Sequence, residues 1–238
     1  MEEYKIQNPI IRERNKIVIA CDVPFEEFFT LVRETRAIPE VGGYKIPARA
    51  GRMGWEKWNR ILKSYTDKIP IYDHQKGGTD VPDTQRGFME DVKASGFSAV
   101  ILYPRLDDEP KVHEFHIREA MDAGLKVMIG GKMTHQQFNS EQYEKAFKIY
   151  ETAYRIGVRN FGLPTNSLPD LEFSENIKRI FWQEKIDFFP IGIGPQGGNL
   201  DEITKIFAGT RFHPIIGRLI YEASNIKQAT LDLASKLN

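Results

Sequence analysis

The sequence of 238 residues contains a single cysteine, Cys21, and this scarcity limits how the chain is stabilised. One cysteine forms neither an internal disulfide nor a four-cysteine zinc site, a pattern typical of proteins from a reducing compartment. A chain of this length buries enough apolar surface to fold without such cross-links. We therefore expect a globular, cytoplasmic protein that is held together by an apolar core.

The sequence also lacks an excess of charge of one sign and a long apolar run. Its 33 basic side chains balance 33 acidic ones, so net charge gives no reason to expect binding to nucleic acid or to an anionic membrane. No stretch approaches the roughly 18 apolar residues of a membrane-spanning helix. The first 16 residues carry charges throughout, unlike a signal peptide. The classes of nucleic-acid-binding, membrane and secreted proteins are therefore disfavoured.

Short apolar runs alternate with longer amphipathic segments along the whole chain. The runs are rich in Val, Ile, Phe and Tyr, and several are nearly continuous in apolar residues, as strands covered on both faces are. Helical patterns of roughly 12 to 17 residues separate them. The eight expected strands are 16–21, 41–46, 68–73, 97–103, 125–130, 157–163, 186–192 and 211–217.

Strict alternation of eight strands with eight helices predicts parallel, right-handed crossovers that close into a (β/α)8, or TIM, barrel. The alternative is a doubly wound open sheet, which usually has fewer strands. No Pro/Gly/Ser-rich linker, charge block or low-complexity run divides the chain. We expect one α/β barrel domain over residues 1–238, in which residues 1–15 form an extension that packs across the barrel floor.

Charged side chains stand where the expected strands end, which is where barrels of this kind hold their catalytic groups. Asp22 follows the first strand, Lys45 lies on the second, and Asp73, Lys76 and Asp80 follow the third. Alternating charges held this close keep a lysine protonated and place negative charge beside it. The cluster suits a reaction that repels an anionic group and then delivers a proton to a carbanion; a solvated charged loop is the alternative.

Glycines follow the seventh and eighth strands. Residues 192–198 read GIGPQGG, and Gly217 precedes Arg218. Barrels often bind phosphate in these two loops through backbone N–H groups and a helix N-terminus. Glycine lets the backbone approach an anion closely, and a guanidinium binds it in a bidentate manner. The two segments therefore predict a phosphate site, with simple turns as the alternative.

Taken in order, these segments resemble orotidine 5′-phosphate decarboxylase over nearly the whole chain. The resemblance is most specific in the last quarter, where GIGPQGG and IIGRLIY are similar to the family's G-x-G-x-Q-G-G and I-[IV]-G-R-x-I-Y segments. IVIACDV and GYKI resemble its first two strands, KMTH resembles its turn after strand five, and TDVPDT resembles the end of its strand-three signature.

The resemblance implies a carboxy-lyase that converts orotidine monophosphate into uridine monophosphate, the last step of pyrimidine nucleotide synthesis, with no metal or other cofactor. Lys76 would donate the proton to carbon 6 of the pyrimidine, and Asp73 would crowd the departing carboxylate. Asp22 and Lys45 would hold the ribose hydroxyls and complete the charge network.

The resemblance also implies the remaining contacts and the oligomer. Thr134 would contact the base, and the phosphate would be held by Gln196, Gly197, Gly217 and Arg218. Asp80 and Thr84 would reach into the site of a neighbouring subunit, which implies a two-fold homodimer with shared active sites.

One departure from the family concerns the loop after strand three. The family reads D-x-K-x-x-D, whereas this chain reads D-H-Q-K-G-G-T-D, with one extra residue in each gap. Residues two apart on a strand point the same way, and residues three apart do not. Either a bulge at His74 and Gln75 re-aims Lys76, or the charge array is altered. Two alternatives therefore stay open: a magnesium-dependent sugar-phosphate decarboxylase or aldolase of the same superfamily, and a catalytically silent nucleotide-binding barrel.

His113 and His116 stand three residues apart on the expected fourth helix. This spacing suits a pair of metal ligands, but no carboxylate or cysteine accompanies them. The pattern favours a solvated helix face.

Overall fold

The computed structural model describes residues 6–74 and 82–237. In this part of the chain, strands adjacent in sequence pair in parallel, because each run of β-branched and aromatic residues is followed by a helix that returns the chain to the same end of the sheet. The strand order is β8-β7-β6-β5-β4-β3-β2-β1-β9. The strands are β1 (Ile17–Ala20), β2 (Val41–Pro47), β3 (Ile69–Asp73), β4 (Ala99–Leu102), β5 (Lys126–Gly130), β6 (Asn160–Pro164), β7 (Asp187–Ile191), β8 (Arg211–Phe212) and β9 (Ile215–Ile216).

One broken strand closes the ring. The strand expected over 211–217 is present, but it is split into β8, which pairs with β7, and β9, which pairs with β1. The linking residues stay bonded to both neighbours: the His213 N–H donates to the carbonyl of Phe188 (2.7 Å), and the Val18 N–H donates to the carbonyl of Pro214 (2.9 Å). The predicted parallel barrel is therefore confirmed, and the open sheet is excluded.

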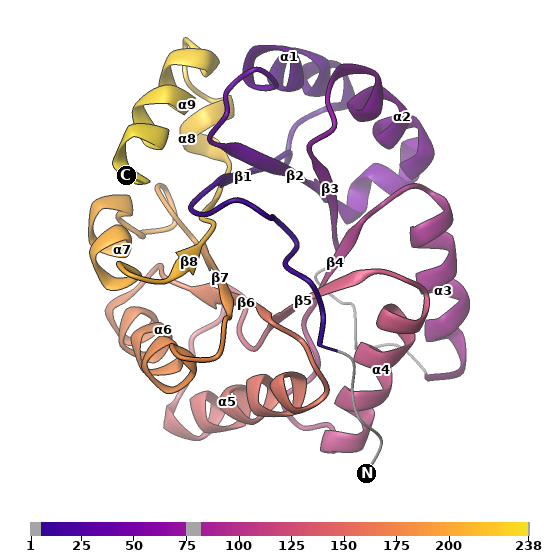
Figure 1. Ribbon diagram of the computed structural model, residues 1–238, viewed down its shortest axis with the longest axis vertical. Helices are drawn as coiled ribbons and strands as arrows, with labels where there is room; N and C mark the ends of the chain where they lie inside the picture. The colour runs from indigo at the N-terminus through magenta and orange to yellow at the C-terminus, as the bar shows by residue number, and fades with distance from the viewer. Residues whose placement is uncertain (1–5, 75–81, 238) are drawn as a thin grey trace.

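Helices surround the barrel (Figure 1). Helix α1, for example, buries Phe28, Leu31, Val32 and Thr35, which have the i, i+3, i+4, i+7 spacing of one helix face. The helices are α1 (Phe25–Thr35), α2 (Trp55–Tyr65), α3 (Pro82–Ala94), α4 (Pro110–Asp122), α5 (Ser140–Arg155), α6 (Leu168–Phe181), α7 (Leu200–Ile206), α8 (Arg218–Tyr221) and α9 (Ile226–Ala234), with 3₁₀ turns η1 (Ala48–Met53) and η2 (Ser235–Leu237).

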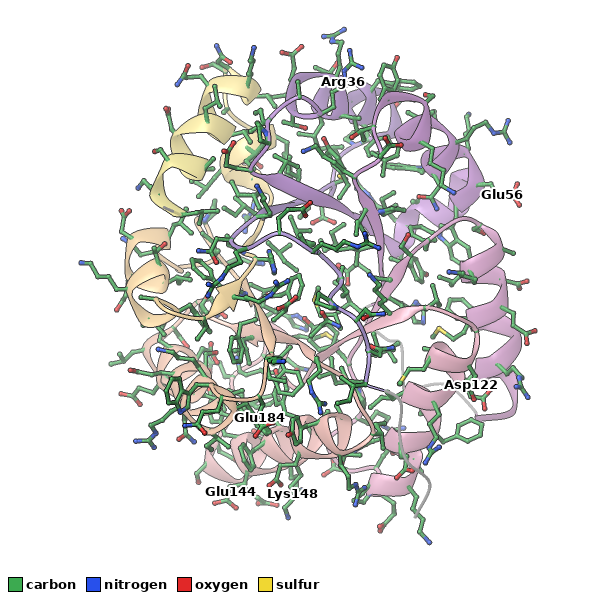
Figure 2. The ribbon with its side chains drawn as sticks, viewed as in Figure 1. Arg36, Glu56, Asp122, Glu144, Lys148 and Glu184 are labelled. Carbon is green, nitrogen blue, oxygen red and sulfur yellow. The ribbon has the colours of Figure 1, made fainter. Side chains whose placement is uncertain are left out.

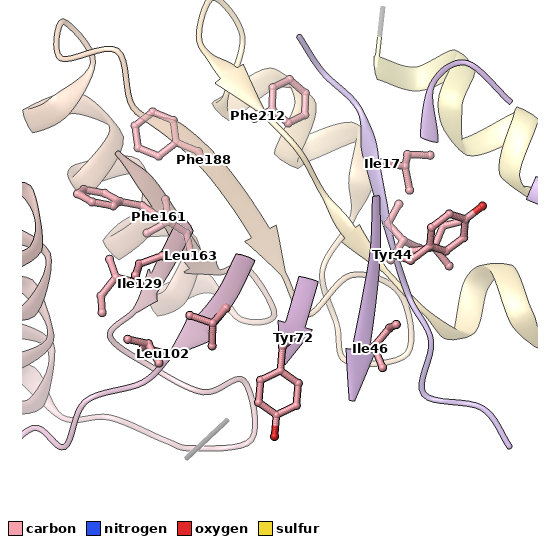
Figure 3. Packing of buried hydrophobic residues seen from close by; sticks show 14 of the residues in the cluster. Ile17, Tyr44, Ile46, Tyr72, Leu102, Ile129, Phe161, Leu163, Phe188 and Phe212 are labelled. Atoms are coloured by element: carbon pink, nitrogen blue, oxygen red, sulfur yellow. The ribbon is translucent and has the colours of Figure 1, made fainter. Parts of the chain in front are cut away.

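The core has two layers because alternate strand residues face opposite sides of the sheet. The larger cluster lies between strands and helices and includes Tyr72, Phe161 and Phe188 (Figure 3). The smaller cluster fills the barrel interior with residues such as Ile71 and Phe189. Many charged side chains lie on the outer surface of the molecule. Figure 2 labels six of them: Arg36, Glu56, Asp122, Glu144, Lys148 and Glu184.

Residues 6–16, which precede β1, cross the floor of the barrel, the end where the strands begin (Figure 1). Ile10 and Ile11 are fully buried in the smaller core cluster. The Ile10 N–H donates to the side-chain oxygen of Asn160 (3.1 Å), and Arg211 donates to the carbonyl of Ile11 (2.8 Å). This segment therefore closes the floor and leaves the opposite end of the barrel for a ligand. No described helix is long and apolar enough to cross a membrane.

Candidate active site

A pocket opens at the carboxyl ends of the strands. It collects residues from the ends of seven of the eight strand positions or from the loops that follow them, far apart in sequence, as the barrel topology requires. Seven of the residues predicted from the sequence line it: Asp22, Lys45, Asp73, Thr134, Gln196, Gly217 and Arg218. The structure therefore brings together Asp22, Lys45 and Asp73 of the predicted charge cluster with residues of both predicted phosphate loops.

The charge cluster centres on Lys45, which points from β2 into the pocket between two carboxylates. Its ammonium forms an ion pair with Asp73 at the end of β3 and lies 3.3 Å from a carboxylate oxygen of Asp22. The strand register produces this arrangement, since Lys45 pairs with Ala20 of β1, two residues before Asp22, and with Ile71 of β3, two residues before Asp73.

Burial and charge act on Lys45 in opposite directions. Its side chain is 9% exposed, and this burial by itself lowers the pKa of the ammonium. The charges of Asp73 and Asp22 outweigh the burial, so that the pKa of Lys45 is raised above its ordinary value. The Lys45 ammonium is therefore held in its charged form. Its partner Asp73 is also buried, so that the two opposite charges lie together at the carboxyl ends of the strands.

Thr134 lies in the turn between β5 and α5. Its carbonyl accepts a hydrogen bond from the side-chain amide of Asn166 (2.9 Å), which holds this turn against the loop after β6. Met133 and His135, on either side of Thr134, also line the pocket. Of these three residues, the sequence analysis assigned a role only to Thr134.

The glycine-rich loop after β7 is a compact turn. The Gly197 N–H donates to the carbonyl of Gly194 and the Gly194 N–H to that of Gly198, both at 2.8 Å. These N–H groups are therefore used inside the loop, and Gln196 of the same loop lines the pocket. Arg218, half-buried at the start of α8, faces the same pocket.

Gly197 shapes the backbone of this loop and is not one of the described residues that line the pocket. Its φ is +114°, a conformation that L side chains rarely adopt, and a Cβ there would come within 2.4 Å of the backbone oxygen of Asn166. Its predicted phosphate contact stays a prediction.

Of the three remaining predicted site residues, the structure describes only Thr84. Lys76 and Asp80 lie outside the described residues. Thr84 is exposed in the first turns of α3 and is not among the described lining residues.

His74 bears on the departure from the family spacing. Its ring stacks on Tyr72 (centroids 5.4 Å apart) and contacts Phe88 of α3 (4.6 Å). Residues 72 and 74 therefore point to the helix side, as alternation along a regular strand requires, while Asp73 points to the pocket. Gln75, the second residue of the proposed bulge, and Lys76, which the bulge would re-aim, lie outside the described residues.

Sequence reasoning missed two tyrosines of the pocket. Tyr103 directly follows β4, where the same strand-end rule would have found it, and Tyr221 lies one turn after Arg218. Burial, and then the charge of Asp73, raise the pKa of Tyr103 well above its ordinary value. Its phenol is therefore a neutral hydrogen-bonding group. Apart from His135, the other lining residues to which the sequence analysis gave no individual role are apolar or glycine: Ala20, Ile101, Met133, Ile191, Gly192, Ile193 and Ile215.

The prediction of a solvated face for His113 and His116 is wrong. Both side chains are buried, and His113 donates from Nε2 to the carbonyl of Arg105 (2.7 Å). They belong to the packing of α4. Within residues 6–74 and 82–237 no group of three or more His, Cys, Asp or Glu side chains is placed to hold a metal ion.

Comparison with known proteins gives relatives in both sequence and structure. No protein-family model matches the chain. The orotidine 5′-phosphate decarboxylase of Methanosarcina mazei is 28% identical over 166 residues, which are 66% of this chain and 68% of the relative. The chain is thus similar in sequence to an enzyme of that name.

Solved structures share the fold. The orotidine 5′-monophosphate decarboxylase of Methanocaldococcus jannaschii, complexed with the inhibitor BMP, has a TM-score of 0.77 at 22% identity and covers 95% of this chain and 100% of its own. The corresponding enzyme of Pyrococcus horikoshii has a TM-score of 0.75 at 22% identity, covering 93% and 98%. An uncharacterized conserved protein from Geobacillus kaustophilus has a TM-score of 0.71 at 15% identity, covering 93% and 100%.

Proposed function

We propose that this chain, a homologue of the orotidine 5′-phosphate decarboxylases, removes the carboxylate of orotidine 5′-monophosphate to give uridine 5′-monophosphate. One observation carries the proposal: Lys45 is buried between Asp22 and Asp73 in a pocket that Gln196 and Arg218 also line. A fixed charge cluster and the predicted phosphate residues in one pocket suit a substrate that carries both a reacting carboxylate and a phosphate.

Different pocket residues are proposed to contact different parts of the substrate. In the proposal, Arg218, Gln196 and Gly217 hold the phosphate, since a guanidinium binds phosphate oxygens in a bidentate manner. Thr134 contacts the pyrimidine. Asp22 is 43% exposed, so its carboxylate is available to the ribose hydroxyls while it still pairs with Lys45.

The chemical step is the breaking of the bond between carbon 6 and the carboxylate carbon. Carbon dioxide leaves, the bonding electron pair stays on carbon 6, and the Lys76 ammonium gives its proton to that carbon. Asp73 disfavours the substrate carboxylate through like charge and keeps the cations in place. A preorganised ammonium beside the developing carbanion stabilises it more strongly where water is excluded. The proposed step uses no cofactor.

We also propose a two-fold homodimer in which Asp80 and Thr84 complete the partner's site. The exposure of Thr84 is compatible with this role. Sedimentation of the purified protein at micromolar concentration should give twice the monomer mass of 27.4 kDa.

The test follows the near-ultraviolet absorbance of the orotate ring when purified protein meets orotidine 5′-monophosphate, with and without a chelator. We expect absorbance loss that the chelator does not slow, abolished by Lys76→Ala and retained in Lys148→Ala, a change on the outer surface (Figure 2). Turnover that the chelator abolishes would favour the magnesium-dependent alternative. Tight binding of uridine 5′-monophosphate without turnover would identify the silent barrel.

A further inference from the structure

A buried ion pair lies behind the pocket, in a place that the proposed reaction does not use. The ammonium of Lys132 lies 2.9 Å from a carboxylate oxygen of Asp170, and the two side chains are 2% and 1% exposed. Lys132 follows β5, and Asp170 is in the first turn of α6. The fold therefore joins two neighbouring loops at the catalytic end of the barrel through opposite charges.

Both carboxylate oxygens of Asp170 accept hydrogen bonds from side chains. Tyr143 donates its hydroxyl to one carboxylate oxygen (2.7 Å), and Ser167, the N-cap of α6, donates to the other (2.6 Å). The N-terminus of α6 favours the negative charge further. Burial, and then the hydrogen bond and charge of Asp170, raise the pKa of Tyr143, which stays a neutral donor. Lys132 also lies 5.3 Å from the centre of the Phe138 ring.

Such a pair is a costly way to gain stability alone. Taking two charges out of water costs several kcal/mol per ion, and apolar residues of similar volume often do as well. What the pair does supply is geometry, because each charge has one place where it is satisfied.

Lys132 directly precedes a turn that lines the pocket, so its ion pair fixes the start of that turn. The next three residues, Met133, Thr134 and His135, all line the pocket. A second contact, from Asn166 to the carbonyl of Thr134, joins the same two loops. The pocket-lining turn is thus fastened on both sides of Met133.

We infer that Lys132 and Asp170 are positioning residues that hold the Met133–His135 turn against the pyrimidine ring of the bound nucleotide. The inference rests on the proposed function, in which Thr134 contacts the base. The phosphate groups are gripped by different loops, so losing the pair lowers affinity for the base while leaving affinity for the sugar phosphate unchanged.

The experiment compares the affinities of uridine 5′-monophosphate and ribose 5-phosphate by calorimetry. The main variant is Lys132→Met with Asp170→Asn, which leaves no unpaired buried charge. The introduced side-chain amide keeps one acceptor oxygen for Ser167 or Tyr143, and its NH2 group can donate to the other hydroxyl. We expect about a tenfold loss of affinity for the nucleotide and less than a twofold change for ribose 5-phosphate, an effect of one good hydrogen-bonded contact. Tyr143→Phe, which removes a single donor, should lose about twofold to threefold.

Lys145→Met is the matched control on α5, because it breaks exposed ion pairs with Asp107 (2.8 Å) and Glu141 (3.0 Å) and should change neither affinity. Wild-type affinity for both ligands in the folded double variant overturns the inference, and so does an equal loss for both. A wild-type protein that binds the nucleotide no better than ribose 5-phosphate contradicts the proposed function itself, and the base-directed role with it.

Discussion

The barrel has a cluster of buried charged residues at each end, and the two clusters differ in whether a carboxylate is open to a pocket. The floor cluster consists of Asp187, Arg211 and His213; the mouth cluster consists of Asp22, Lys45 and Asp73. In the floor cluster, both carboxylate oxygens of Asp187 accept from Arg211, at 2.5 and 3.2 Å. Arg211 also donates to the carbonyl of Ile11 and fastens the segment that closes the floor.

The mouth cluster is built from the same kinds of group but opens onto a pocket. Asp187 is 1% exposed, whereas the Asp22 side chain is 43% exposed beside the pocket. Charges paired with each other inside the fold hold neighbouring segments in place, whereas charges held with one side open to a pocket are preorganised for a ligand. The comparison predicts that changes at the mouth reduce activity far more than changes at the floor.

The largest expected effect is at the centre of the mouth cluster. Lys45→Met removes the cation between two carboxylates and should lower kcat/KM for orotidine 5′-monophosphate by at least about 1000-fold. It also leaves Asp73 buried without its cation, so the melting temperature should fall. Steady-state kinetics below the unfolding transition separate the two effects. A loss of less than tenfold would remove Lys45 from the catalytic array.

The matching change at the floor should lower stability while leaving activity nearly unchanged. Asp187→Asn breaks the pairing with Arg211 and should reduce the free energy of unfolding by about 3 kcal/mol. The activity of the folded protein should stay within twofold of wild type. Urea unfolding and kinetics on the same preparations make the comparison, and a large loss of kcat would show that the two ends are coupled.

The phosphate loops give a smaller effect that depends on the substrate. Arg218→Ala should raise KM for orotidine 5′-monophosphate by about 30-fold, the worth of a hydrogen bond between charged groups. With orotidine, which has no phosphate, the same variant should equal wild type. Equal losses with both substrates would place Arg218 elsewhere in the mechanism.

The sequence predicted the elements well because apolar runs and helical periods are local properties. All eight strand positions lie where the runs of Val, Ile, Phe and Tyr placed them. The break in the eighth strand was not foreseen, although Pro214, which lacks an N–H, stands at that point. Seven site residues followed from two rules, that functional groups stand at strand ends and that glycine loops there bind phosphate, together with the family resemblance.

What the sequence could not provide is pairing across the fold. Lys132 and Asp170 are 38 residues apart, and each reads as an ordinary surface charge until β5 and α6 bring them together. His113 and His116 were misjudged for a related reason, because the carbonyl of Arg105 that satisfies His113 comes from the preceding loop. Tyr103 was missed by incomplete use of the strand-end rule.

The smallest predicted effect is the pH dependence of the floor. Burial lowers the pKa of His213 below its ordinary value of 6.5, against the opposing pull of Asp187. The unfolded chain therefore binds a proton that the folded protein does not, so stability is fully present above about pH 6.5 and declines as the pH falls below it.

Urea unfolding between pH 5 and 8 should show this decline in the wild type, by no more than about 1.4 kcal/mol per pH unit for one group. In His213→Gln the contribution of this group to the slope disappears, while activity at pH 7.5 stays within twofold because the floor does not contact the substrate. The Lys45 cation behaves oppositely: its raised pKa keeps its contribution constant through neutral pH and loses it only in strong alkali. An unchanged slope in His213→Gln would mean that the floor's acid sensitivity arises from another group, and the contrast between the two ends would then rest on the ion pairs alone.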